Sequence, residues 1–289
     1  MWILFAALGA LAKALTSVVR KKIADTNPAI YVFLSFSIIS ISLSVVTMLA
    51  PSDSLGTVKY GLLPLVLSGL VQTIAIRANM FAFRHEQLSY ITPMFALTPL
   101  YAAIIGLVIL NERPSAVGLA GIFAIVCGVY VVTSDKGIGL RQTATRILHS
   151  KGARVGMLIP IAYAVSATMN KAAINDGVTP LASVAFISAV MGLCNIYVLK
   201  TSWSHVVDTL KDINLRKYIL IASMLGIASV GFAALALNEA FASYALGIRR
   251  LDVLITVLIG WKYMGDNNAL RRIIGAVIMT IGVVMLSVG

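Results

Sequence analysis

Long apolar segments, separated by short polar turns, make up most of this chain. Each segment has about 20 residues, enough helix to cross a hydrocarbon core of roughly 30 Å. The turns contain Pro, Asn, Asp or Gly, the residues that commonly end helices. The pattern therefore predicts ten transmembrane helices, over residues 2–19, 30–50, 61–83, 88–110, 115–133, 155–174, 180–199, 218–240, 242–263 and 271–288.

Composition supports this interpretation. Hydrophobic residues form 59% and charged residues 12% of the 289 residues, whereas a soluble domain has about 25% charged residues. We therefore expect an all-α integral membrane protein. Segment 2–19 is expected to be its first membrane helix and not a cleaved signal, because the basic cluster follows the apolar run. The longest polar stretches are 134–153 and 200–217, and the second is compatible with a short amphipathic surface helix.

The net charge of +12 is distributed unequally among the connections. The odd-numbered connections carry 16 basic residues, Arg20 among them, whereas the other side carries Lys59, Arg113 and Lys171. Because basic loops tend to face the cytoplasm, we expect cytoplasmic odd connections and external termini in a multi-pass protein of the cell (plasma or inner) membrane. This explains the charge without a nucleic-acid partner, since the sequence shows no basic patch on a soluble face.

The second half of the chain repeats the first. A shift of 154 residues overlays 89–133 on 243–287 without a gap, and residues 20–25 resemble 171–176. Because each half would hold five helices, an odd number, the second half enters the membrane in the opposite orientation. Transporters are commonly built from such inverted repeats, with the substrate site between them.

Two repeat units and a linker follow from this overlay. The first five-helix repeat is expected over 1–134, a basic connecting loop over 135–153, and the second five-helix repeat over 154–289. Prolines in the fourth and sixth segments predict kinks there, at Pro93, Pro99 and Pro160. Recurring glycines in the fifth and tenth segments predict close helix packing, at Gly118, Gly121, Gly128, Gly275 and Gly282.

Four stretches of the sequence resemble the EamA-type ten-helix members of the drug/metabolite transporter (DMT) superfamily. They are LSYITPMFALTPLYAAIIGLVILNERPS and GLAGIFAIVCGVYVV in the first half, and IRRLDVLITVLIGWKYMGD and IIGAVIMTIGVVML in the second. An acidic residue after the fourth helix of each half is part of that resemblance, and Glu112 and Asp266 fill the role here. The resemblance implies a ten-helix fold and secondary active transport of a metabolite. Such relatives often have cytoplasmic termini, whereas the loop charges here predict the reverse.

Charged side chains within the apolar segments are the candidate functional residues, because charges at membrane depth usually face a cavity, a partner or a substrate path. The ninth segment carries Arg249, Arg250 and Asp252. Arg249 and Asp252 share a helical face, so they either form an ion pair or leave the arginines to present a guanidinium fork to an anion. The basic pair also resembles that of the phosphate-translocator branch, which implies an anionic or phosphorylated solute.

Lys13, Arg77 and Tyr244 are further candidate substrate-binding residues. For Lys13, in the first segment, the alternative is a structural pair with backbone carbonyls or a carboxylate such as Asp252. For Arg77, near the end of the third segment, the alternative is a side chain that reaches out to water. Asp252 and Glu239 are the candidate carboxylates for a coupling proton.

The sequence as a whole predicts a secondary transporter that moves a small metabolite by alternating access through a central cavity. It contains no GxxxxGK[ST] phosphate loop, and we expect no cofactor, no metal and no enzymatic activity. His85, His149 and His205 lie in loops that no catalytic motif joins. A channel or a lipid-handling protein of the same fold is the alternative, and a membrane-embedded enzyme is a more remote one. The expected partners are a small-molecule solute and the lipid bilayer, and a homodimer stays open.

Overall fold

The computed structural model describes residues 1–49, 55–86, 91–111, 115–133, 145, 149–249, 251–264 and 269–288. Throughout this part of the chain the secondary structure is helical. The first half contains α1 (Trp2–Lys22), α2 (Pro28–Leu49), the 3₁₀ helix η1 (Leu55–Gly61), α3 (Leu62–His85), the 3₁₀ helix η2 (Thr92–Leu97), α5 (Thr98–Ile109) and α6 (Ala116–Thr133). The second half contains α8 (Lys151–Asn175), α9 (Pro180–Leu193), α10 (Val198–Thr201), α11 (Trp203–Lys211), α12 (Ile213–Glu239), α13 (Ala242–Arg249), α14 (Leu251–Met264) and α15 (Ala269–Val288).

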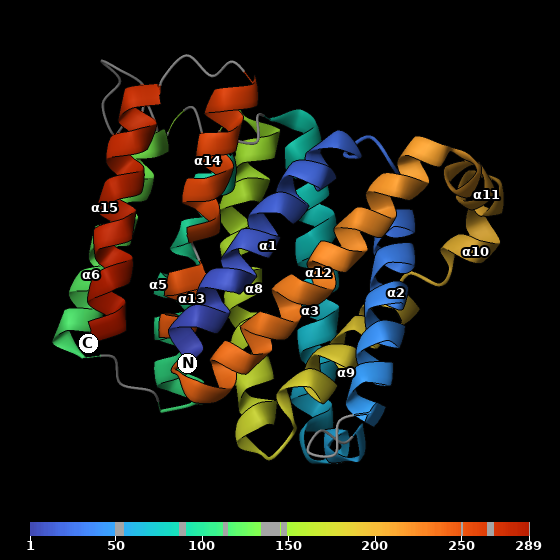
Figure 1. Ribbon diagram of the computed structural model, residues 1–289, viewed down its shortest axis with the longest axis horizontal. Helices are drawn as coiled ribbons and strands as arrows, with labels where there is room; N and C mark the ends of the chain where they lie inside the picture. The colour runs from blue at the N-terminus through green and yellow to red at the C-terminus, as the bar shows by residue number, and fades with distance from the viewer. Residues whose placement is uncertain are drawn as a thin grey trace.

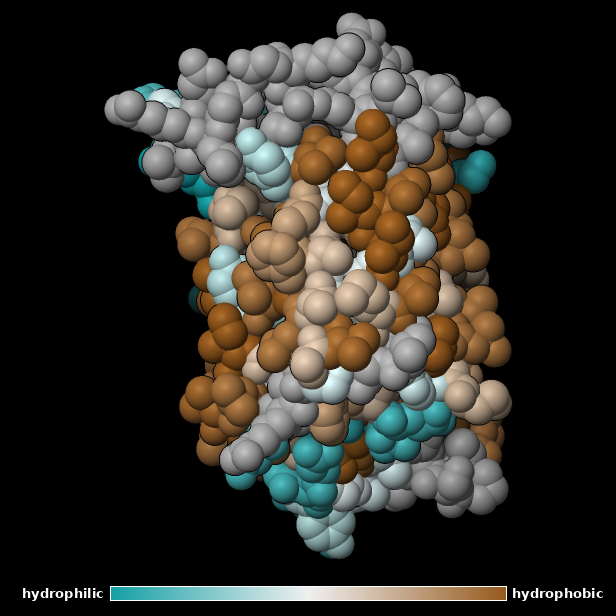
Figure 2. Space-filling view, turned by 90° about the vertical axis from the view of Figure 1, so that its left-hand side faces the viewer, coloured by the Kyte–Doolittle hydropathy of each residue, from teal (hydrophilic) through white to brown (hydrophobic). Residues whose placement is uncertain are grey.

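The outer surface of this bundle is apolar, as a bilayer requires. Six helical stretches within the described ranges are long and apolar enough to cross a membrane, namely α1, α2, η1 with α3, α8, α9 with α10, and α12. On α1 the outward face follows helical spacing, with Leu4, Leu8, Leu11 and Leu15 all at least 38% exposed. Figure 2 shows hydrophobic residues covering the middle of one face, above a hydrophilic lower edge. The predicted all-helical, multi-pass membrane protein is therefore confirmed.

Helices from the two halves pack against one another in four extensive pairs. These pairs are α1 with α12, α3 with α8, α2 with α9, and α6 with α15. In Figure 1, α6 and α15 lie side by side at one edge of the molecule, while α2 and α9 lie toward the other. The largest buried apolar cluster joins α2, α3, η2, α8 and α9 and includes Tyr31, Phe83 and Phe95. The fold thus places the first half directly against the second along its whole length.

Glycines allow the close contact between α6 and α15. A Cβ atom added to Gly128 would lie 2.6 Å from the carbonyl oxygen of Gly275. A Cβ atom added to Gly282 would lie 2.5 Å from the carbonyl oxygen of Gly121. Both distances are too short for any larger residue without a shift of the backbone, so the close packing that the glycine spacing predicts is confirmed at these positions.

The fourth predicted segment is interrupted near its middle. There η2 gives way to α5 at Thr98, with Pro93 and Pro99 at the first positions of the two helices. The prolines predicted this interruption. The ninth predicted segment is described as α13, up to Arg249, and α14, from Leu251.

The helix ends that border the odd-numbered connections lie together at the upper end of the bundle in Figure 1, which we call the basic end. Both chain termini lie toward the opposite end. Two basic residues that the sequence analysis counts with the charges of the connections are instead buried within helices. Arg20 in α1 and Lys171 in α8 are each only 8% exposed. Their exposure in solvated connections is a wrong prediction. The helix α1 continues past the predicted end at residue 19 to Lys22, and Lys171 lies inside α8.

The polar stretch 200–217 contains the predicted surface helix, but only as α11, which spans Trp203–Lys211. Residues 213–217 already belong to α12, whose first turn is capped by the Asp212 carboxylate accepting from the backbone N–H groups of Asn214 and Leu215. In Figure 1, α10 and α11 lie at the side of the bundle, away from α6 and α15.

Candidate functional site

A cavity of about 100 Å³ lies between the two halves. Side chains from α1, α2, α3, α8, α9, α12 and α13 line it, so both halves contribute to its wall. Its lining combines three basic side chains, several hydroxyls, two amides and an apolar side. Within the described lining there is no Asp or Glu. A concave site with few, specific polar groups inside an apolar fold is the usual form of a small-molecule binding site.

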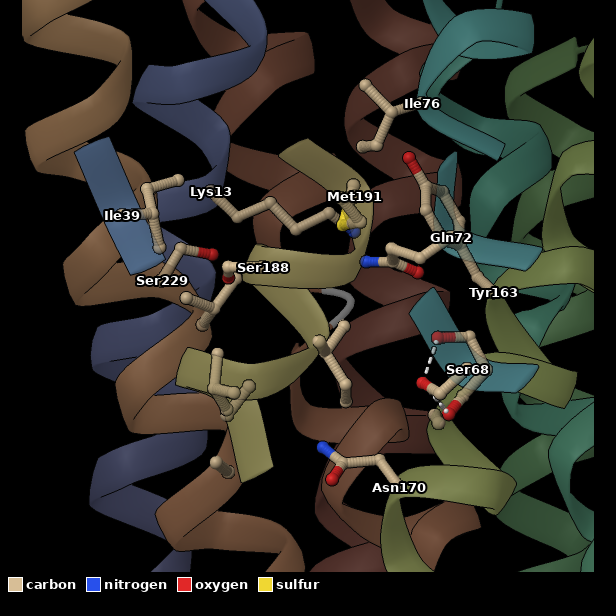
Figure 3. Close-up of a pocket in the computed structure, with 18 of the residues that line it drawn as sticks. Lys13, Ile39, Ser68, Gln72, Ile76, Tyr163, Asn170, Ser188, Met191 and Ser229 are labelled. Atoms are coloured by element: carbon tan, nitrogen blue, oxygen red, sulfur yellow. Dashed lines mark hydrogen bonds between the residues drawn. The ribbon is translucent and has the colours of Figure 1, made fainter. Parts of the chain in front are cut away.

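One face of α1 supplies two of the three cations. Lys13, Thr16 and Arg20 follow the i, i+3, i+7 spacing of a single helical face, and all three line the cavity. Figure 3 shows the Lys13 side chain extending across the cavity toward Gln72 and Tyr163. The Lys13 ammonium lies 5.4 Å from the centre of the Tyr163 ring, within the range of a cation–π contact.

Lys13 also forms an ion pair that joins the two halves. Its Nζ atom lies 2.9 Å from Oδ2 of Asp252, at the start of α14. The Asp252 side chain is 1% exposed and the Lys13 side chain 14%, so both charges are largely removed from water. This is the structural alternative that the sequence left open for Lys13.

Arg20 is the cavity residue that sequence reasoning missed. Its Nε–H donates to the phenol oxygen of Tyr31 at 2.8 Å, and the guanidinium carbon lies 5.5 Å from the centre of the same ring. The phenol of Tyr163 is a second neighbour. The signal that could have found Arg20 is its spacing from Lys13 and Thr16 on α1, because seven residues bring a side chain back to the same face.

Arg249 is the third cation, and its position agrees with the predicted substrate role. It ends α13, lines the cavity, and donates from Nη2 to the hydroxyl of Ser229 on α12 at 3.0 Å. Arg250, its predicted partner in a guanidinium fork, lies outside the described residues, as do Glu112 and Asp266. The substrate role predicted for Arg250 therefore stays a prediction.

Polar groups on α3 and α8 complete the lining. The Ser68 hydroxyl on α3 lies 2.9 Å from both the carbonyl oxygen and the hydroxyl of Ser166 on α8. Asn170, one turn further along α8, is 8% exposed, and its Oδ1 atom has no hydrogen-bond partner among the described residues. In Figure 3, Asn170 lies at the end of the cavity opposite Ile76. Asn170, near the end of the sixth predicted segment, is therefore part of the cavity wall.

Three other predicted residues lie away from the cavity lining. Arg77 on α3 donates to the phenol oxygen of Tyr197, and its guanidinium carbon lies 5.8 Å from the centre of that ring. The Tyr244 hydroxyl accepts a hydrogen bond of 2.9 Å from the backbone N–H of Ser115, just before α6. Glu239, which ends α12, is 40% exposed and lies 3.8 Å from the amino group of Met1. Each of these contacts gives the residue a structural role within the bundle.

No cluster of three metal-binding side chains occurs in the described part of the chain. The polar groups that face the cavity are basic, hydroxyl and amide groups, and Asp252, the buried carboxylate beside it among the described residues, is paired with Lys13. Such groups can hold an anion by charge-assisted hydrogen bonds.

Comparison with known proteins concerns the fold and the family. A crystal structure described only as that of a protein has a TM-score of 0.70 and 11% sequence identity, over 99% of this chain and 96% of its own. At that identity the likeness shows the fold alone. No curated protein matches the chain in sequence. Residues 1–134, just under half of the chain, match the model of the EamA-like transporter family, which is part of the DMT superfamily of membrane transporters.

Proposed function

We propose that the protein is a secondary carrier that moves a small organic anion by alternating access. The observation that carries this proposal is the charge of the central cavity. Lys13, Arg20 and Arg249 line it, and no acid occurs among the described lining residues. Even with Asp252 included, the charge of the site is positive, which favours an anion in a low-dielectric surrounding.

The packing of the helices supports a ten-helix architecture of inverted repeats. The helix pairs α1–α12 and α3–α8 are exchanged when the halves are exchanged, while α2–α9 and α6–α15 each map onto themselves. A cavity between such repeats can open to one side and then to the other when one half rocks against the other.

Asp252 is the favoured coupling carboxylate. It is buried, it belongs to the second half, and it holds Lys13 of the first half. Protonation of Asp252 would remove its charge and release Lys13 for a solute anion, which links proton binding to the contact between the halves. Glu239, the other candidate, is partly exposed at the end of α12 and lies further from this contact.

The charge pattern favours a cytoplasmic basic end. Two matched lysines test this in a variant whose Cys127 and Cys194 are replaced by serine. Lys22→Cys lies at the basic end and Lys59→Cys at the opposite end, and both lysines are exposed. In intact cells we expect a membrane-impermeant maleimide to label position 59 and not position 22. The reverse pattern would reverse the orientation.

Exchange in liposomes tests the carrier itself. Purified protein is reconstituted with unlabelled pyruvate, succinate, benzoate or phenyl phosphate inside, and uptake of the same labelled anion is followed from outside. A carrier gives one-for-one counterflow, with uptake that overshoots equilibrium. A channel gives only dissipation of the gradient. No uptake of any of these anions would reject the anionic class.

A further inference from the structure

We infer that Arg20 is the residue that binds the anionic group of the solute, and that the solute is a small organic anion with an apolar body. The inference rests on the proposed carrier function and deepens it by assigning one anchor and one substrate class. The sequence drew attention to Arg249 and Arg250 in the ninth segment. The contacts of Arg20 make it the better-defined anion site.

Arg20 is a buried charge whose partners among the described residues are neutral. Its side chain is only 8% exposed. Its described contacts are the phenols of Tyr31 and Tyr163, and no carboxylate of the described residues lies within ion-pair distance of it. Buried charges are normally paired with an opposite charge. A solute anion would supply the opposite charge that these neutral partners do not.

Lys13 differs from Arg20 in the charge of its partner. Lys13 lines the same cavity from the same face of α1, but Asp252 lies 2.9 Å from its ammonium. A solute anion at Lys13 must therefore compete with a carboxylate that is already in place. At Arg20 the anion competes with the neutral phenols of Tyr31 and Tyr163, and hydrogen bonds to ionised acceptors are roughly twice as strong as neutral ones.

The guanidinium geometry suits such a ligand. Of the five N–H donors of an arginine, Nε–H of Arg20 donates to Tyr31, and the two terminal amino groups carry the other four, more than the phenol of Tyr163 can accept. Tyr31 fixes the orientation of the group, because the same ring also lies under the guanidinium. A planar carboxylate or a phosphate can then be held by two parallel hydrogen bonds.

The apolar side of the cavity indicates the rest of the solute. Phe36 and Ile39 of α2 and Val184 and Ile187 of α9 are buried and line the cavity. Phe36 and Ile39 follow Tyr31 on α2 by five and eight residues, which is roughly 8 and 12 Å of helix. An anion held at Arg20 would therefore place its organic body against these side chains. Inorganic phosphate has no such body and should bind less well.

The test compares Arg20→Gln with Arg20→Lys and with the control Lys22→Gln. Lys22 is exposed and lies two residues from Arg20, so Lys22→Gln removes the same charge from the same helix end. The readout is the apparent Kd from thermal stabilisation of purified protein by benzoate, phenyl phosphate, pyruvate and succinate, with inorganic phosphate and benzyl alcohol for comparison. We expect Arg20→Gln to raise the apparent Kd at least about tenfold and Arg20→Lys about threefold, since a point charge replaces a bidentate fork.

The control variant and the comparison ligands complete the test. The apparent Kd of Lys22→Gln for the organic anions should stay within about twofold of wild type, because exposed surface charges contribute little. Benzyl alcohol and inorganic phosphate should stabilise wild type less than the organic anions do. Equal losses in Arg20→Gln and Lys22→Gln, or no stabilisation of wild type by any organic anion, would overturn the inference.

Should Arg20→Gln fail to fold, Tyr31→Phe tests the same site. It removes the hydrogen bond that orients the guanidinium but keeps its charge and the ring beneath it. We expect the apparent Kd for the organic anions to rise about threefold, the loss of one modest hydrogen bond. Unchanged binding in Tyr31→Phe would count against Arg20 as the anion site.

The carrier function and the anion site can fail separately. Anion binding without counterflow would reject the carrier and keep the anion site. Counterflow that is unaffected in Arg20→Gln would reject the site and keep the carrier.

Discussion

Arg20 in α1 and Lys171 in α8 occupy corresponding positions in the two halves, because residues 20–25 align with 171–176. Both are 8% exposed. Lys171 donates to the carbonyl oxygen of Leu237 at 2.6 Å. That carbonyl belongs to the last turn of α12, where free carbonyl groups and the helix dipole stabilise a cation. Arg20 meets neutral phenols at the wall of the cavity instead.

The two aligned cations therefore have different surroundings. Both halves keep a buried cation at this position, but the second half uses its cation to hold two helices together. The first half leaves its cation facing the cavity. Lys13 and Thr16 extend the same face of α1, whereas the cavity-lining residues of α8 include Ser166, Ala167 and Asn170. Of these two corresponding helices, α1 brings the positive charge and α8 brings neutral groups.

The largest expected effect is at the ion pair between the halves. Lys13→Ala leaves the buried Asp252 carboxylate without its Lys13 partner, and breaking such a pair costs about 3–5 kcal/mol. We expect a loss of that size in the free energy of unfolding, measured by SDS titration in mixed micelles. The double variant Lys13→Ala with Asp252→Ala should recover part of it. Lys22→Ala, an exposed lysine on the same helix, is the control, and an equal effect there would argue against the pair.

Substitution of Lys171 tests whether the two aligned cations have different roles. Lys171→Met keeps the length of the side chain but loses a charged hydrogen bond, which should lower the free energy of unfolding by about 1.5–3 kcal/mol. Anion binding should stay within about twofold of wild type, because this cation is neutralised by a helix end. Arg20→Gln should give the opposite result, with lost binding and a smaller change in stability. Lost anion binding in Lys171→Met would show that the two positions still share one role.

Where the halves are equivalent, matched substitutions should give matched effects. Gly128 and Gly282 correspond under the 154-residue shift, and an added Cβ at each would approach a carbonyl oxygen of the facing helix to 2.6 and 2.5 Å. We expect Gly128→Ala and Gly282→Ala to lower the free energy of unfolding by similar amounts, about 1–3 kcal/mol each. Gly177 is unsuited as a control because its φ is +99°. A clear difference between the two variants would mean that the α6–α15 contact has diverged as the cavity has.

Local patterns predicted most of the fold and little of the site. Apolar length and turn residues act over one segment, so they predicted the helices and the close packing at Gly128 and Gly282. Arg20 was misplaced because it directly follows an apolar run, and such residues are usually interfacial. Its partners Tyr31 and Tyr163 lie 11 and 143 residues further on, and no spacing within α1 encodes them.

The ninth segment also depends on contacts between distant parts of the chain. The i, i+3 spacing of Arg249 and Asp252 suggested a pair within one helix. In the structure, the Asp252 carboxylate forms an ion pair with Lys13, 239 residues away in sequence. A pattern within one segment does not contain such a tertiary contact.

The smallest expected effect concerns a neutral contact between the halves. Ser68 on α3 is fully buried and hydrogen-bonds to Ser166 on α8. Ser68→Ala should lower the free energy of unfolding by about 1 kcal/mol, the net value of one such bond. Ser35 on α2 is a matched control, because it is equally buried and its hydroxyl has no hydrogen-bond partner among the described residues. Ser35→Ala should therefore be neutral or slightly stabilising, since it removes a buried polar group that is not satisfied. Equal changes in the two variants, measured by the same SDS titration, would show that the Ser68 contact adds no stability between the halves.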